Sequence, residues 1–236
     1  MNINRVDIMK IVFDIGGSIL CPNSVPDVKL LKKISDLMIN LYEKGHRMII
    51  VTGGGKFTKN YIKAARNFTK DESFLDVIGI QGTRMNALLM IVALGDHAYK
   101  KVVKNIDDLQ HGISTGKIVV MGGTVPGQTT DAVSVAAAEY FGADMIIIAT
   151  DVDGVYERDP KKYKKAKLIK HMKPEEIYGI VRKKKYEAGS LTILDPVAAK
   201  LLVKNRIKTI ILNGRKIDNM KNAIEGKKFK GTVIGD

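Results

Sequence analysis

The sequence has no tryptophan and a single cysteine, and it has no long apolar run. Because Cys21 stands alone among 236 residues, no internal disulfide can form, and a reducing compartment is expected. No apolar run approaches the roughly 20 residues of a membrane-spanning helix. The first residues show no apolar signal core followed by a cleavage site. We therefore expect a cytoplasmic protein that does not bind membranes.

Two common nucleotide-binding motifs are missing as well. Without GxxxxGK[ST] the chain has no P-loop, and without GxGxxG a dinucleotide site is disfavoured. The net charge of +14 raises the question of nucleic acid, and residues 161–185 hold eleven Lys and Arg against two Glu. No aromatic residues alternate with these charges as in single-strand binders, so we expect a solvated basic surface and no nucleic-acid site.

Short apolar runs that often end in glycine alternate with helical patterns along the chain. Strands are predicted at 10–14, 47–51, 98–103, 117–120, 144–149, 208–212 and 231–234. Helices are predicted at 27–44, 56–69, 71–94 with a bend near Gly79 or Gly82, 130–141, 174–181, 196–205 and 217–224. Gly142 and Asp195 read as a helix stop and a helix cap. The alternation predicts a largely parallel sheet covered on both faces.

Four loops that follow predicted strands carry the chemistry. Glycines at 16–17 and 53–55 let backbone amides approach a phosphate, since no Cβ intrudes. Residues 124–131 add three threonine hydroxyls before a helix, and residues 150–160 suit a polar planar ligand. In parallel sheets such loops converge on one crevice. Asp131 would orient a lysine or a metal there, or would only cap its helix.

The order of the motifs resembles a known family. IGGS, GGGK, IGIQGTRMNALL, GGTVPGQTTDA, TDVDGVYERDP and AGSLTILDPVAAK follow one another as in archaeal-type uridylate (UMP) kinases of the amino acid kinase superfamily. The resemblance runs from about Met9 to the C-terminus. It implies a three-layer α/β/α sandwich on a mainly parallel sheet of about eight strands. It also implies phosphoryl transfer from ATP to UMP, giving UDP and ADP in pyrimidine nucleotide biosynthesis, with Mg²⁺ carried by ATP and a homohexameric assembly.

The resemblance also implies how the site is divided. Residues 1–236 would form a single amino acid kinase domain, with a UMP-binding lobe at 9–142 and an ATP-binding lobe at 143–236. The implied UMP contacts are Gly54, Asp76, Thr124, Val125, Pro126, Gly127, Gln128, Thr129 and Thr130. The implied ATP contacts are Gly17, Ser18, Gly55, Lys59, Thr150, Asp151, Tyr156 and Asp159. Asp131 and Lys56 are the expected catalytic residues, and no side chain is assigned to a metal.

The chain departs from the superfamily pattern at two charged positions. Asp14 stands where many members carry a lysine on the first strand, and Asp151 replaces the lysine of a bacterial TKVDG motif. Phosphoryl transfer needs positive charge around the moving oxygens. We expect Lys56, Lys59 and Mg²⁺ to supply it, with Arg84 as the next candidate.

Three other functions compete with this interpretation. An isopentenyl phosphate kinase would carry a histidine in the loop after the second strand, and GGGKFTKNY has none. A non-catalytic nucleotide- or oxyanion-binding protein could share the fold, and an RNA-binding protein could use residues 161–185. The resemblance begins near Met9, so we expect the first eight residues to be dispensable.

Overall fold

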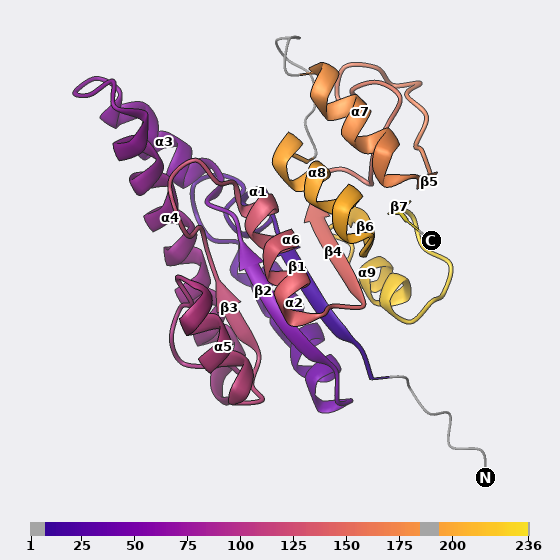
Figure 1. The fold of residues 1–236 in the computed structure, drawn as a ribbon, viewed down its shortest axis with the longest axis horizontal. Coiled ribbons are helices and arrows are strands. Elements are labelled where there is room, and N and C mark those ends of the chain that lie inside the picture. The colour runs from indigo at the N-terminus through magenta and orange to yellow at the C-terminus, as the bar shows by residue number, and fades with distance from the viewer. Residues whose placement is uncertain (1–7, 185–193, 236) are drawn as a thin grey trace.

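The computed structural model describes residues 8–184 and 194–235. The expectation about the first eight residues lies almost wholly outside this part, as does residue 185 of the basic segment. Within the described ranges the chain builds one sheet with helices on both faces (Figure 1).

The sheet contains seven strands in the described residues, where about eight were expected. They are β1 (Lys10–Ile15), β2 (Arg47–Thr52), β3 (Val119–Met121), β4 (Met145–Thr150), β5 (His171–Met172), β6 (Lys208–Asn213) and β7 (Thr232–Ile234). Their order is β3-β2-β1-β4-β6-β7-β5, and every neighbouring pair is parallel except β6 and β7. After β1 the chain winds outward to β2 and β3 and then returns to add β4 on the other side. The strand order therefore reverses between β1 and β4, which is where such sheets bind ligands.

Two helical layers cover the sheet. The helices are α1 (Gly17–Leu20), α2 (Val28–Glu43), α3 (Gly55–Ala65), α4 (Glu72–Leu94), α5 (Ile106–Ser114), α6 (Thr130–Phe141), α7 (Pro174–Lys184), α8 (Pro196–Asn205) and α9 (Ile217–Ile224). One buried cluster joins the sheet to α2, α4 and α9, and a second joins it to α5, α6, α7 and α8. Figure 1 shows α6 and α8 in front of the strands.

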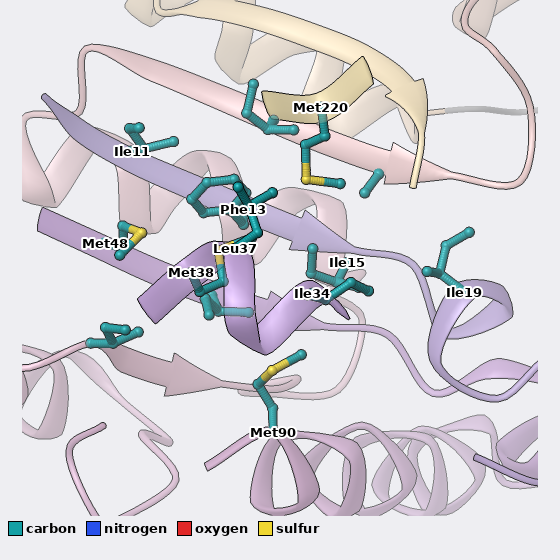
Figure 2. Close-up of a cluster of buried hydrophobic side chains, with 14 of the residues drawn as sticks. Ile11, Phe13, Ile15, Ile19, Ile34, Leu37, Met38, Met48, Met90 and Met220 are labelled. Atoms are coloured by element: carbon teal, nitrogen blue, oxygen red, sulfur yellow. The ribbon is translucent and has the colours of Figure 1, made fainter. Parts of the chain in front are cut away.

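The alternation of β1 divides its side chains between these layers. Ile11, Phe13 and Ile15 belong to the α2 side and are fully buried. Figure 2 shows them with Ile34 and Met38 of α2. Because successive side chains of a strand point to opposite faces, Asp14 lies on the α6 side. A carboxylate is thus buried beneath the helix that follows the third glycine loop.

The helix ends follow the sequence signals. Asp195 caps α8 by accepting hydrogen bonds from the backbone N–H groups of Val197 and Ala198 at 2.7 and 3.2 Å. Gly142 ends α6 with a φ of 62°, in the left-handed region, which glycine adopts without strain because it has no Cβ. The predicted cap and the predicted stop are therefore confirmed.

Several predicted elements are wrong. Residues 98–103 form only isolated bridges to Ile118 and Met121, and α5 and the short β5 were not foreseen. The helix expected over 56–69 ends at Ala65, and α4 runs unbroken through its two glycines. Gly82 is retained inside α4 because an added Cβ would lie 2.1 Å from the Thr58 hydroxyl of α3.

One helical stretch, Glu72–His97, is long and apolar enough to cross a membrane by length and composition alone. This corrects the expectation that no segment reaches that length, because Gln81, Arg84 and Asn86 hid the apolar window. In the structure 44% of that window is buried inside the protein.

Candidate active site

The loops after β1 and β2 form a floor of glycines beside the strand reversal. Gly16 donates its backbone N–H to the carbonyl of Ala149 on β4, and Gly53 donates to the carbonyl of Ile15 on β1. A Cβ on Gly17 would lie 1.9 Å from the nitrogen of Gly55, and one on Gly53 would lie 2.5 Å from the nitrogen of Gly17. Only glycine fits at these positions, so the two loops are locked together by direct backbone contact.

The glycine floor is tied to α4 from below. Asn86 donates from its amide to the carbonyls of Gly53 and Gly54 at 2.7 and 3.3 Å. Its amide oxygen accepts a hydrogen bond from the Cys21 thiol at 3.2 Å. Burial raises the pKa of that thiol, so Cys21 is a neutral structural group here.

Residues 122–130, which are expected to hold the acceptor and are called the acceptor loop here, are fixed to the same helix. Asp76 accepts a hydrogen bond from the backbone N–H of Gly127 at 2.7 Å. Arg84 donates from Nε to the carbonyl of Gly123 and from Nη2 to that of Thr124, both at 3.1 Å. Arg84 therefore uses two of its hydrogen-bond donors to hold the loop, whereas the sequence suggested that it neutralises a phosphate.

Three carboxylates meet where α6 and α8 begin. The Ser134 hydroxyl donates to Asp14 Oδ2 at 2.8 Å, and the carboxyl groups of Asp14 and Asp131 lie close enough to shift each other's pKa. Asp195 also raises the pKa of Asp131 through its charge, and its carboxylate accepts the Thr129 hydroxyl at 2.5 Å. Thr129 caps α6, since its side chain accepts from the N–H of Ala132. The alternative that Asp131 is only a helix cap is therefore wrong.

The environment of this cluster disfavours negative charge. Burial raises the pKa of Asp14 to about 6, the nearby charge of Asp195 also raises it, and the hydrogen bonds from Ser134 and Asp131 partly oppose the rise. Burial also raises the pKa of Asp131 well above its usual range, and the charges of Asp14 and Asp195 add to that effect. Two neighbouring carboxyl groups repel each other when both are ionised, so the site favours the neutral form of each more than water does.

The loop after β4, which is expected to hold the donor nucleotide and is called the donor side here, is stabilised by ion pairs. Lys161 Nζ lies 2.6 Å from Asp151 Oδ2, and its backbone N–H donates to Asp159. Asp153 pairs with Lys216 and Lys230, each at 2.7 Å. Burial raises the pKa of Asp153, but the hydrogen bonds and charges of the two lysines together outweigh burial, so the net shift is downward. Lys161 therefore places a positive charge beside Asp151, at the position where a lysine was expected from the bacterial motif.

The remaining predicted site residues surround these features. Ser18 offers its carbonyl to Arg215 Nη2 at 2.8 Å, Thr150 accepts from the N–H of Gly214, and Tyr156 forms an isolated bridge with Leu168. Lys56 and Lys59 are exposed at the start of α3, and neither side chain forms a hydrogen bond or an ion pair with the other described residues. Their roles stay predictions.

The donor set bears on the expected Mg²⁺. Among residues 8–184 and 194–235, no group of three His, Cys, Asp or Glu side chains is arranged to hold a metal ion. Magnesium in nucleotide enzymes commonly uses one or two carboxylates together with substrate phosphates. Asp14 and Asp131 suit that mode, in which most ligands come from the nucleotide and water.

Sequence reasoning overlooked three neighbours of the site. Asp14 was treated as a missing lysine, Asp195 only as a cap, and Lys161 only as part of a basic surface. The alternation of β1 could have placed Asp14 beneath the loop helix. The contact of Asp195 with Thr129 spans 66 residues and had no local signal.

A large cavity lies elsewhere in the described residues. It measures about 970 Å³ and is lined by Lys173, Arg206 and Lys208 at the opposite end of the sheet. The converging loops are nevertheless the candidate active site, because they bring backbone donors and carboxylates together.

This combination of a glycine floor, an acceptor loop and a parallel sheet defines a class of phosphotransferase. The chain belongs to the amino acid kinase family, whose profile matches residues 9–213. Within it, the chain groups with archaeal uridylate kinases. The uridylate kinases of Methanococcus aeolicus and Pyrococcus abyssi are each 44% identical over 96% of this chain and 99% of theirs.

Solved structures agree with the fold. The uridylate kinase from Archaeoglobus fulgidus superposes with a TM-score of 0.85 at 36% identity, covering 96% of this chain and 100% of that one. The UMP kinase from Bacillus anthracis reaches 0.75 at 21% identity, covering 97% and 96%, which speaks for the fold alone.

Proposed function

We propose that the protein transfers the γ-phosphoryl group of ATP to UMP, giving UDP and ADP. A phosphate oxygen of UMP attacks the γ-phosphorus while the bond to the β,γ-bridging oxygen breaks, and ADP leaves with that oxygen. The observation that carries the proposal is the meeting of the glycine floor, the acceptor loop and Asp131 at the strand reversal. The similarity to uridylate kinases over nearly the whole chain supports UMP as the acceptor.

The residues of this chain act mainly by positioning. Amides of the glycine floor and the N-terminus of α3 face the phosphates, and such backbone donors need no reorganisation during transfer. Lys56 and Lys59 add positive charge at that helix start. Mg²⁺, carried by ATP, supplies further charge on the phosphate oxygens. Residues 9–142 hold the acceptor in this scheme, and residues 143–236 hold the donor.

Asp131 orients the reacting groups. It lies between the acceptor loop and the start of α8, close to Asp14 and Asp195, whose charges raise its pKa. A bound cation would favour the ionised form of Asp131, because opposite charge lowers a carboxyl pKa. The carboxylate would then fix a lysine or the metal.

The direct test is a panel of nucleoside monophosphates with ATP and Mg²⁺, followed by identification of the products. UDP formation with UMP preferred over CMP, AMP and GMP is expected. Turnover of isopentenyl phosphate without turnover of UMP would overturn the assignment. Tight UMP binding without any product would favour a non-catalytic binding protein.

A homohexamer is part of the proposal, and α4 offers a face for a second copy. Met85, Leu88 and Val92 lie on its outer side and are 60%, 48% and 71% exposed. A cavity of about 410 Å³ beside them is lined also by Phe57 of α3. An apolar strip of this kind is typical of subunit contacts. Light scattering should give a multimer, and Leu88→Asp should reduce its mass. The location proposed for this assembly is the cytoplasm.

A further inference from the structure

The start of the acceptor loop is held by consecutive residues of α4. Thr83 Oγ1 accepts the backbone N–H of Gly123 at 2.7 Å, and Arg84 takes the carbonyls of Gly123 and Thr124. Gly122 approaches so closely that an added Cβ would lie 2.6 Å from the Thr83 hydroxyl. The Thr83 carbonyl is in turn fixed by the Thr52 hydroxyl of β2 at 2.9 Å.

The two carbonyls bound by Arg84 decide where the neighbouring amides point. In a trans peptide the C=O and the following N–H lie on opposite sides. Holding the carbonyls of Gly123 and Thr124 toward α4 turns the N–H groups of Thr124 and Val125 away from that helix. Within the described residues neither N–H has a hydrogen-bond acceptor, so both are available to a ligand.

We infer that Arg84 is a positioning residue, which sets the affinity for the acceptor by clamping residues 123–125 rather than by neutralising its phosphate. The inference rests on the proposed function for the identity of the acceptor. A guanidinium presents donors in a fixed fork that matches two adjacent oxygens, whereas lysine offers one compact charge. Charge and clamping are therefore separable by substitution.

The experiment compares Arg84→Lys, which keeps the charge, with Arg84→Gln, which removes it. Both should raise KM for UMP about tenfold, the size expected for a lost hydrogen bond to a charged group. We expect kcat within about twofold and KM for ATP unchanged, because uniform binding is what is lost. Arg47→Lys is the matched control: Arg47 Nη2 bonds the Ile113 carbonyl at 3.0 Å, at the opposite end of β2.

Thr83 gives a second pair of variants should Arg84 variants fold poorly. Thr83→Val removes the acceptor for Gly123 and should raise KM for UMP, and Thr83→Ser keeps the hydroxyl and should restore it. Wild-type KM in Arg84→Lys with a raised KM in Arg84→Gln would show that charge matters, and would overturn the clamp. Normal KM in both Arg84 variants would overturn it as well.

Amide hydrogen exchange separates this inference from the proposed function. Without any nucleotide, residues 123–128 should exchange faster in Arg84→Lys than in wild type or Arg47→Lys. Unchanged exchange would overturn the clamp whatever the enzyme phosphorylates. Faster exchange in a protein that does not turn over UMP would leave the clamp standing and reject the acceptor assignment.

Discussion

The two sides of the candidate site, which we propose hold the acceptor and the donor, are built by different means. On the acceptor side, backbone atoms of the glycine floor touch directly, and α4 holds the loops by hydrogen bonds from Asn86, Thr83 and Arg84. On the donor side, Asp151 and Asp153 are held by lysines that are 48–56% exposed. Steric fit should therefore govern the first region, and charge and salt the second.

The largest effect is expected from Gly17→Ala. Its Cβ would lie 1.9 Å from a backbone nitrogen that cannot move aside cheaply. We expect a loss of at least about 3 kcal/mol in unfolding free energy and loss of activity. Gly179→Ala is the control, since nothing lies within 4 Å of its Cβ in α7, and it should stabilise by roughly 0.5–1 kcal/mol. Denaturant unfolding of both variants measures the difference, and equal stabilities would show that the floor is not sterically locked.

Asp131→Asn tests the group that stands between the two regions. We expect kcat to fall about 10²–10³-fold, with KM for UMP and ATP changed little, because an orienting group acts mainly in the transition state. Steady-state kinetics with each substrate varied provides the measurement. A variant with full activity and a lower melting temperature would reduce Asp131 to a structural role.

The lysines at the start of α3 test the source of positive charge. At least one of Lys56→Ala and Lys59→Ala should lower kcat about 10²–10³-fold at saturating metal and substrates. Neither should change the melting temperature, since both side chains are exposed. Normal turnover in both would move the search to Lys161, which stands on the donor side.

Asp14→Asn should stabilise the fold, and more so at neutral than at acid pH. The pKa of Asp14 rises from 3.8 to about 6 on folding, so the folded state binds the proton more tightly. The resulting stabilisation amounts to about 3 kcal/mol. It is fully present below about pH 4 and is lost as the pH rises through about 6. The gain in the melting temperature of the variant should therefore grow between pH 4 and pH 7. A gain independent of pH would mean that Asp14 does not titrate in this range.

The smallest effect on stability is expected from Lys161→Ala. An exposed ion pair contributes about 0–1 kcal/mol, so unfolding should hardly change. KM for ATP should rise about threefold at low salt and less at high salt, because ions screen exposed charges. Lys165→Ala, a neighbouring exposed lysine, should leave KM for ATP unchanged. An equal rise of KM for ATP in both variants would show that only the overall positive charge of the basic segment matters.

What could be predicted from the sequence was local. The glycine loops after β1 and β2, the Gly142 stop and the Asp195 cap each have a signal within a few residues. The strand predicted at 98–103 forms only isolated bridges, which the sequence could not show, because an apolar run does not reveal whether a partner strand lies beside it. Contacts such as Arg84 with Gly123 or Asp14 with Ser134 join distant segments, and only the folded chain shows them.

The hydrogen bond between Thr129 and Asp195 joins the N-terminal caps of α6 and α8. Each residue caps its own helix, α6 or α8, and each uses its remaining capacity on the other. The positive ends of two helix dipoles thus meet at one point and offset the carboxylates gathered there. Separating the starts of α6 and α8 would break a hydrogen bond of about 1.5–3 kcal/mol and remove those dipoles from the charges they stabilise. We therefore expect nucleotides to enter this site by rearrangement of loops, while the starts of α6 and α8 stay joined to each other.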